Sequence, residues 1–261
     1  MADWDPDQYD RFKEQRAQPF WDLVELVHRG AIERAVDLGC GSGDMTVAVA
    51  DRLGIHHLTG IDNSPAMLEA ASQHGRVAVS FVYGDIARWT SDADHDLVLA
   101  NAALHWVPDH VAVLERWVGA LAPEGQLAIQ VPANHDHPSY LASAHVASQE
   151  PFASAFGGEP PPDPVAANVL APERYATVLH ELGLAEPHVR LQVYPHVMQS
   201  AEAVVEWTKG TSLMRFFKRL PPEMHDPFVD AYREEVVARL GLAEPYFFTF
   251  KRILMWGRMH G

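Results

Sequence analysis

Short apolar runs alternate with helical patterns through the first half of the chain, and this alternation constrains the fold more than any other feature. Strands are expected at residues 34–40, 57–64, 79–85, 95–106 with the following loop, and 126–132. Helices are expected between them at 42–54, 65–75 and 110–125. Strands that alternate with helices in this way predict a parallel sheet covered by helices on both faces.

The second half of the chain is less regular. Residues 134–170 contain the cluster "GGEPPPDP", which predicts an irregular loop or lid. The later patterns predict a helix at 172–183, a strand at 188–197, helices at 201–210 and 222–241, and a last strand at 246–259. We therefore predict one domain over 1–261, with an N-terminal lid at 1–30, a core at 31–133, and cap insertions at about 134–170 and 200–242.

The composition indicates in which cellular compartment the protein is expected and which kinds of binding partner are disfavoured for it. The formal net charge of −15 argues against a protein built to coat nucleic acid or an anionic membrane. A single cysteine, Cys40, excludes an internal disulfide framework and is typical of a reducing cytoplasm. The start "MADWDPDQYD" lacks the apolar stretch of a signal peptide, and no apolar run is long enough to span a bilayer. We expect a cytoplasmic monomer or weak homodimer that binds a small molecule, and neither nucleic acid nor membrane.

The stretch "AVDLGCGSGD", residues 35–44, follows the first predicted strand. Glycines at such a turn let backbone N–H groups and a helix N-terminus approach a ligand closely. Gly39, Gly41 and Gly43 are evenly spaced, unlike the G-x-G-x-x-G pattern of dinucleotide sites. Asp37 precedes them and would repel a pyrophosphate, whereas it suits a cationic amino group. S-adenosylmethionine (SAM) carries that group and no phosphate, so it is the expected cofactor.

Two further carboxylates stand at the carboxyl ends of the next two predicted strands. Asp62 is placed to accept the ribose hydroxyls, and Asp85 to accept from the adenine amino group, with Ile86 against the ring. Any one of these acids taken alone is as typical of a turn or a helix cap. All of them, however, stand at the carboxyl ends of successive strands, where ligands bind in open α/β sheets.

The stretches "VDLGCGSG", "GIDNSPAML", "GDI" and "LVLANAALHWVPDH" together resemble class I SAM-dependent methyltransferases. More narrowly, "WDPDQYDRFKEQRAQP", "NAALHWVPDH" and "QVPAN" resemble the trans-aconitate 2-methyltransferase family. The resemblance implies a Rossmann-like sheet, mostly parallel with an antiparallel last strand, a helical cap, and methyl transfer from SAM to a carboxylate oxygen. The further cofactor-binding candidates in these motifs are Asn63, Met67, Asn101 and Arg16, the last also a candidate for the substrate.

The acceptor side needs little chemistry from the protein. A carboxylate is already ionised at neutral pH, so catalysis rests on alignment and on the exclusion of water. His105 and Trp106 follow the fourth predicted strand, close to where the methyl group is expected. Trp106 offers a π face to a cation or the substrate, and His105 donates to a substrate oxygen or acts as a base for a hydroxyl acceptor. Plain packing against the next helix is the alternative.

A charged acid as substrate needs cations, and these concentrate in "TKGTSLMRFFKRL". The candidate substrate contacts are Lys209, Arg215, Lys218, Arg174 and Tyr9. Tyr9 and Trp4 are also expected to close over the cofactor, with plain aromatic packing as the alternative. A solvated helix face is the alternative for the cations. The family that the chain resembles usually reads W-x-x-G-T-G-L-R-P here, whereas Met214 stands at the arginine position and Arg215 is shifted by one. That shift rotates a helical side chain by roughly 100°, so the usual tricarboxylate contact is expected to be missing or rebuilt.

Other functions remain open at the level of sequence. The acceptor of a SAM-dependent enzyme could be a hydroxyl or carbon of a specialised metabolite, and a SAM-binding protein without turnover is a further alternative. The glycine spacing and Asp37 disfavour a nicotinamide-dependent dehydrogenase. The fourth strand ends in "NAAL" and lacks the [ND]-P-P-[YF] pattern of base methyltransferases, which disfavours nucleic acid as the substrate.

Overall fold

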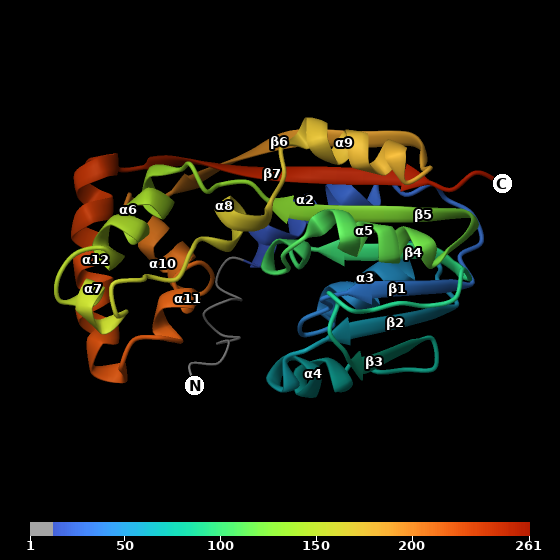
Figure 1. The fold of residues 1–261 in the computed structure, drawn as a ribbon, viewed down its shortest axis with the longest axis horizontal. Coiled ribbons are helices and arrows are strands. Elements are labelled where there is room, and N and C mark those ends of the chain that lie inside the picture. The colour runs from blue at the N-terminus through green and yellow to red at the C-terminus, as the bar shows by residue number, and fades with distance from the viewer. Residues whose placement is uncertain (1–12) are drawn as a thin grey trace. The chain divides into compact units, whose positions relative to one another are not determined.

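The computed structural model describes the backbone of residues 13–261 and the side chains from residue 17 onward. Within that part, seven strands form one sheet in the order β3-β2-β1-β4-β5-β7-β6 (Figure 1). Their bounds are β1 Arg34–Leu38, β2 His57–Asp62, β3 Val79–Tyr83, β4 His95–Asn101, β5 Leu121–Pro132, β6 Ala185–Met198 and β7 Tyr246–Arg258. The neighbours from β1 to β5 pair in parallel, and β7 is antiparallel to β5. The predicted fold class, mostly parallel with an antiparallel last strand, is confirmed.

The helices of the first half begin and end at the residues that local chemistry favours. They are α2 Lys13–Val24, α3 Asp44–Leu53, α4 Pro65–Ser72, the 3-10 turn η1 Leu104–Trp106, and α5 His110–Gly119. Gly54 ends α3 in the left-handed conformation, and Ser64 caps α4 directly before Pro65. One boundary was wrong: the helix predicted to extend to residue 125 ends at Gly119, because Leu121 already pairs with His95 as the first residue of β5.

The second half contains more helix than the sequence indicated. Its helices are α6 Pro138–Ala147, α7 Phe152–Ala155, α8 Pro164–Asn168, α9 Pro172–Glu181, α10 Ala203–Lys209, α11 Met214–Phe217, η2 Pro222–Met224 and α12 His225–Leu240. The prediction of a loop or lid over 134–170 was wrong for α6, α7 and α8. The Gly/Pro cluster between α7 and α8 is irregular as expected, and Gly157 and Gly158 there have φ of 67° and 82°.

The chain divides into two compact units, which are described separately. The sheet unit comprises Ala17–Pro132, Asn168–Gln192 and Arg252–Gly261. Strand β1 is buried from Ala35 to Leu38, as expected for a strand inside a parallel sheet. Helices α5 and α9 lie side by side on one face of the sheet, and α2 lies on the other (Figure 1).

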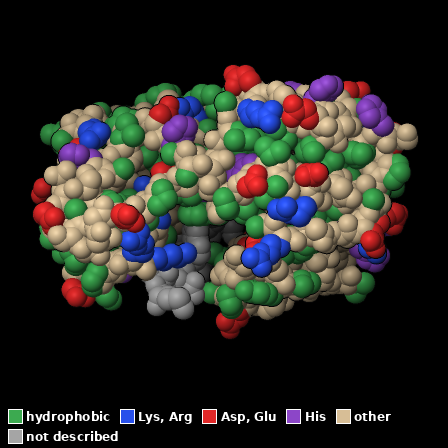
Figure 2. Space-filling model, in the orientation of Figure 1, with side chains coloured by type: hydrophobic (Ala, Val, Ile, Leu, Met, Phe, Trp, Pro, Cys, Tyr) green, Lys and Arg blue, Asp and Glu red, His purple; other side chains and the backbone are tan. Residues whose placement is uncertain are grey.

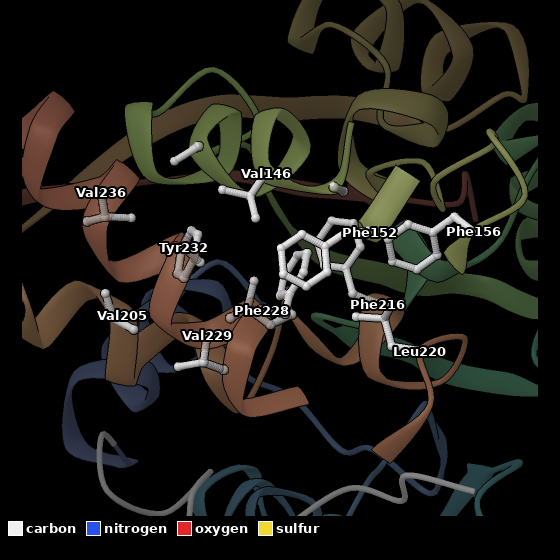
Figure 3. Close-up of a cluster of buried hydrophobic side chains, with 13 residues drawn as sticks. Val146, Phe152, Phe156, Val205, Phe216, Leu220, Phe228, Val229, Tyr232 and Val236 are labelled. Carbon is white, nitrogen blue, oxygen red and sulfur yellow. The ribbon is translucent and has the colours of Figure 1, made fainter. Parts of the chain in front are cut away.

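The helical unit comprises, among the residues with described side chains, Ala133–Ala167 and Val193–Lys251. Helix α12 packs along α6, and aromatic side chains fill the space between the helices (Figure 3). Phe152 and Phe216 both contact the ring of Phe228, with ring centroids 5.0 and 4.9 Å from it. This unit therefore has a hydrophobic core of its own. The domain boundaries proposed from the sequence stay a prediction.

Candidate functional site

The glycine turn after β1 has a fixed geometry at the carboxyl edge of the sheet. Gly39, Gly41 and Gly43 have φ of 83°, 55° and 80°, values that side chains rarely adopt. A Cβ on Gly39 would lie 2.2 Å from the Cβ of Ala103, so this backbone and the segment after β4 approach as closely as they can. At Gly41 a Cβ would meet nothing within 4 Å. The backbone of the turn thus packs tightly against Ala103 at Gly39, whereas at Gly41 there is open space beside it.

Asp37 lies under this turn and is 4 % exposed. The hydroxyl of Thr46, in α3, donates to its Oδ2 over 2.6 Å. Burial raises the pKa of Asp37 to about 6, against the hydrogen bond from Thr46, and the charge of Asp62 adds to the rise. A buried carboxylate is stabilised by an opposite charge, so Asp37 is a favourable place for a ligand's ammonium group.

Asp62 connects the turn to α4. Its Oδ2 accepts from the backbone N–H of Gly41 at 2.9 Å, and its Oδ1 accepts from the N–H of Ser64 at 2.8 Å. Because each carboxylate oxygen has a second lone pair, these bonds leave acceptor capacity for ribose hydroxyls. Asn63 is exposed and Met67 is half-buried, and the N–H of Met67 donates to the Ser64 cap. The sequence pattern predicted that Asp62 binds the cofactor, but it did not predict the hydrogen bond from Gly41 to Asp62 that holds the turn.

The segment after β3 carries the two residues predicted to contact the adenine, one of them exposed and the other buried. Asp85 is exposed, and its Oδ1 accepts from the N–H of Ala87 at 2.9 Å. Ile86 is 8 % exposed, and its carbonyl accepts from the indole N–H of Trp117. The backbone between the two predicted adenine contacts is therefore anchored to α5.

The loop after β4 carries the predicted catalytic pair. Asn101 ends β4 and is half-buried, and Ala102 has a φ of 51°, a strained value for alanine. His105 is 7 % exposed, and its Nδ1 has no hydrogen-bond partner among the described residues. Trp106 is 43 % exposed, with its ring centroid 4.7 Å from that of His105.

His105 is neutral across the physiological range. Burial lowers its pKa to about 3, and the charge of Arg252 lowers it further. A histidine with this pKa is a poor general base near pH 7, since a base works best when its pKa lies close to the working pH. The ring can still donate to or accept from an oxygen as a neutral group.

The predicted substrate cations lie in different places. Arg174 is in the sheet unit, exposed on α9, and its Nη1 donates to Glu181 at 3.3 Å. Lys209 and Lys218 are in the helical unit, where Lys209 pairs with Glu206 at 3.5 Å and Lys218 is exposed. Tyr9 and Trp4 fall outside the described residues, as does the side chain of Arg16, whose backbone belongs to α2.

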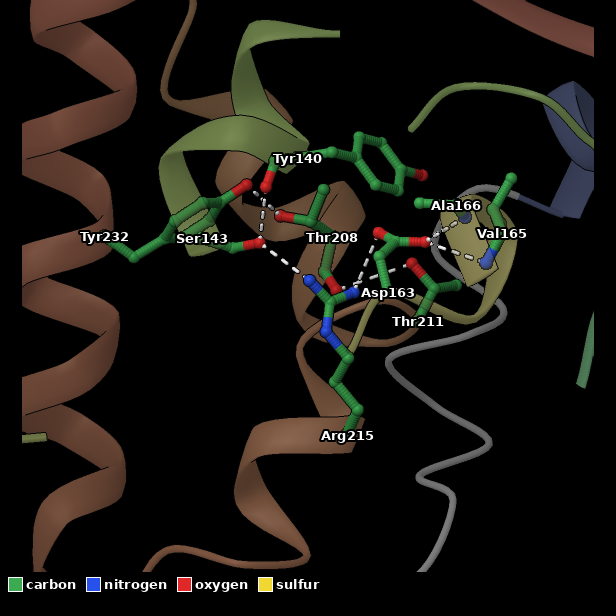
Figure 4. A network of polar contacts seen from close by, with 9 residues as sticks. All are labelled: Tyr140, Ser143, Asp163, Val165, Ala166, Thr208, Thr211, Arg215 and Tyr232. Carbon is green, nitrogen blue, oxygen red and sulfur yellow. Dashed lines mark hydrogen bonds and ion pairs between the residues drawn. The ribbon is translucent and has the colours of Figure 1, made fainter. Parts of the chain in front are cut away.

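Arg215 is buried, 8 % exposed, and its guanidinium is engaged inside the helical unit (Figure 4). Its Nη1 donates to Asp163 Oδ2 at 3.0 Å, and its Nη2 donates to the hydroxyl of Ser143 at 3.2 Å. The other oxygen of Asp163 accepts from the N–H groups of Val165 and Ala166 at the start of α8. Burial lowers the pKa of Arg215, and the charge of Asp163 opposes this effect.

Arg219, like Arg215, donates hydrogen bonds to the irregular segment between α7 and α8. It donates to the carbonyls of Glu159 and Phe156, at 2.8 and 3.1 Å. Two arginines at and just after α11 therefore hold the Gly/Pro cluster, Arg219 at its start and Arg215 at its end. No sequence pattern predicts these contacts, because the partners lie more than fifty positions apart.

Three polar residues near His105 were also missed. His110, Asn168 and Tyr175 make hydrogen bonds that reach the 3-10 turn η1. Within the described residues, no cluster of three or more His, Cys, Asp or Glu side chains has the arrangement of a metal site. Among the same residues, no helix is long and apolar enough to cross a membrane.

Comparison with known proteins gives a consistent result. Residues 35–125 match a family model described as a methyltransferase domain. The chain is 37 % identical to a trans-aconitate 2-methyltransferase from Deinococcus radiodurans over 96 % of both chains. It is 38 % identical to one from Mycobacterium sp. strain KMS, over 98 % of this chain and 99 % of the relative.

Solved structures agree in fold. The YcgJ protein from Bacillus subtilis superposes with a TM-score of 0.61 at 16 % identity, covering 93 % of this chain and 98 % of that one. Phosphoethanolamine N-methyltransferase 2 from Haemonchus contortus, in complex with S-adenosyl-L-methionine, has a TM-score of 0.56 at 14 % identity. It covers 94 % of this chain and 52 % of that one.

Proposed function

Because the chain belongs to the trans-aconitate 2-methyltransferase family, we propose that it forms a methyl ester on trans-aconitate or a closely related small polycarboxylic acid. The enzyme class, a SAM-dependent methyltransferase, and the cofactor predicted from the sequence are confirmed. The observation that carries the substrate is the 36–39 % identity to relatives of that name over at least 90 % of the chain.

The residues at the carboxyl edge of the sheet suit SAM. Asp37 would hold the ammonium group, Asp62 the ribose hydroxyls and Asp85 the adenine amino group. The open space beside Gly41 lets a ligand approach the backbone there. When bound, SAM supplies a methyl group on a sulfonium that an oxygen can attack. Asn63, Met67, Asn101 and Ile86 are proposed to complete this site, and Arg16 to reach the cofactor or the substrate.

The state of His105 supports an acid as the acceptor. A hydroxyl must lose its proton during transfer, whereas a carboxylate is ionised already and needs no base. Neutral His105 is suited to orienting an acceptor oxygen through a hydrogen bond, and Trp106 presents its exposed ring beside it. The roles of Arg174, Lys209, Arg215, Lys218 and Tyr9 as substrate contacts stay predictions. A cytoplasmic location is part of the proposal, supported by the single cysteine.

Incubation of the purified protein with methyl-labelled SAM and a panel of acids tests the proposal. Trans-aconitate comes first, followed by cis-aconitate, citrate and monocarboxylic acids of similar size. We expect a base-labile methyl ester on trans-aconitate, identified by mass spectrometry. Methylation of a phenol or an amine, with no ester on any acid, would overturn the substrate class while leaving the enzyme class intact.

Replacing His105 by alanine separates the two kinds of acceptor. A carboxylate acceptor should still be methylated with an altered KM, because no proton is removed. A hydroxyl acceptor that depends on His105 as a base should lose turnover instead.

A further inference from the structure

We propose that His110 and Tyr175 are positioning residues for methyl transfer, which set the geometry of η1 and through it His105 and Trp106. The inference rests on the proposed role of those two side chains in the acceptor site. Both positioning residues lie in the sheet unit, on α5 and α9.

His110 and Tyr175 form a buried pair. His110 is 2 % exposed and Tyr175 is fully buried. The Tyr175 hydroxyl lies 2.5 Å from Nδ1 of His110, and the two rings stack with centroids 5.9 Å apart. On the other side of the imidazole, Nε2 lies 3.0 Å from the carbonyl oxygen of Leu104, the first residue of η1.

The acceptor at one end of this chain of groups assigns a direction to each of its hydrogen bonds. A carbonyl oxygen accepts, so Nε2 of His110 carries a proton and donates to Leu104. Burial lowers the pKa of His110, which keeps the ring neutral, and Nδ1 therefore accepts from the hydroxyl of Tyr175. The Tyr175 oxygen in turn accepts from the backbone N–H of Leu170 at 3.3 Å. Tyr175 thus selects the tautomer that holds Leu104.

A second contact holds the next carbonyl of the same turn. The side-chain amide of Asn168 donates to the backbone oxygen of His105 at 2.9 Å. At the start of the loop, the N–H of Ala102 donates to the carbonyl of Gln130 in β5, at 2.9 Å. The backbone around η1 is thus tied to β5, to α5 and to the segment that leads into α9.

This support matters because the imidazole of His105 is weakly fixed by its own bonds. Its buried Nδ1 has no partner among the described residues, so that nitrogen does not set the ring's direction. The backbone at Leu104 and His105 must do so, together with the contact between the two rings of η1. A displacement of about 1 Å at a reacting group can cost up to a hundredfold in rate. The pair therefore acts on turnover more than on cofactor binding.

The test compares Tyr175→Phe with Tyr232→Phe. Both tyrosines are fully buried, and each hydroxyl has a polar side-chain partner, His110 Nδ1 or the Thr208 hydroxyl 2.9 Å away. Losing either hydroxyl should lower the melting temperature by a similar small amount. We expect only Tyr175→Phe to lower kcat, by roughly tenfold, with an unchanged Kd for SAM. Equal kcat in the two variants, or a parallel loss of SAM affinity in Tyr175→Phe, would overturn the inference.

Two variants at His110 test whether a conservative replacement of its hydrogen-bond donor preserves turnover. His110→Gln keeps a donor that reaches the Leu104 carbonyl, whereas His110→Leu removes it at similar volume. The kcat values should fall in the order wild type, His110→Gln, His110→Leu. If glutamine restores stability but no turnover relative to leucine, the role is structural alone.

A measurement without turnover keeps this inference separate from the proposed function. Nitrogen-15 NMR of the histidine rings reports the tautomer of each ring, with the His105 signals assigned by their absence in His105→Ala. The His105 signals should shift in Tyr175→Phe and stay in place in Tyr232→Phe. Unshifted signals would contradict the positioning role even if trans-aconitate proves to be the substrate. Failure of the wild type to methylate any acid would contradict only the function.

Discussion

At the scale of single residues, the proposed cofactor site is built at the expense of stability. Asp37 is held out of water with its pKa near 6, well above the ordinary value of 3.8. Its proton stabilises the folded protein below about pH 4, and that contribution is lost as the pH rises through about 6. At neutral pH the ionised, buried carboxylate therefore destabilises the ligand-free protein by about 3 kcal/mol.

Asp37→Asn should reverse this effect. The amide oxygen can still accept from Thr46, and no charge is buried. We expect the ligand-free variant to unfold at a higher temperature than the wild type at about pH 8, with the gain vanishing towards pH 4. The Kd for SAM should rise tenfold or more, since the counter-ion of the ammonium group is lost. Thermal unfolding across pH and calorimetric titration measure the two effects, and a lower melting temperature at pH 8 would contradict the first.

Two of the three glycines of the turn, Gly39 and Gly41, give a matched comparison. Gly39→Ala would place a Cβ 2.2 Å from Ala103 at a φ of 83°, whereas Gly41→Ala meets open space at a φ of 55°. The Gly41 variant should lose about 1–2 kcal/mol of stability through backbone strain. The Gly39 variant should lose clearly more, because the loop after β4 must also move. Denaturant unfolding of both variants decides this, and equal losses would mean that the close approach costs little.

At the scale of elements, periodicity predicted what local chemistry controls and missed what distant contacts control. The strands of the first half and α3, α4 and α9 follow strong apolar patterns with Gly or Pro at their ends. Helix α6 was not predicted from the sequence, because its buried face includes small and polar residues, such as Ser139 and Ser143. Such residues give no strong helical pattern of hydrophobicity. The sequence pattern placed the three carboxylates proposed for the cofactor site at or near the ends of strands, where the structure has them. His110–Tyr175 and Arg215–Asp163 could not, since each joins residues far apart in the sequence.

The element α11 is predicted to depend on its buried ion pair. Arg215→Met leaves Asp163 without its charged partner in a setting where both side chains are 13 % exposed or less, and should cost about 3–5 kcal/mol. Adding Asp163→Asn should recover much of that loss, because the remaining charge is removed. Arg219→Met is the control. This exposed residue would lose its hydrogen bonds to two carbonyls, and the free energy of unfolding should fall by about 1–2 kcal/mol. A double-mutant cycle by denaturant unfolding with no coupling would show that the pair is not a stabilising unit.

The same variants examine the substrate prediction for Arg215. If the double variant is stable but its KM for trans-aconitate rises, Arg215 also contacts the acid. An unchanged KM would leave Arg215 with its internal role.

At the scale of the whole molecule, an acidic protein is proposed to bind an anion. The formal net charge is −15, and acidic and basic side chains are interspersed over the face seen in Figure 2. The summed field therefore repels a trianion at long range, while any attraction must come from local cations.

Ionic strength should expose that repulsion. Moving from low salt to about 0.15 M shortens the Debye length to about 8 Å and screens the distant charges. We expect kcat/KM for trans-aconitate to rise over this range, and to change less for a monocarboxylic acid. A fall in kcat/KM for the trianion would mean that local cations dominate its approach.

The position of β7 in the sheet has a consequence for synthesis of the chain. Strand β5 is complete at Pro132, but the strand that pairs with its second edge begins only at Tyr246. While the intervening residues are being made, the backbone groups along that edge have no native partner, and such an edge is open to pairing with another nascent chain. The synthesis of the last strand therefore sets the moment at which this edge of β5 can be covered.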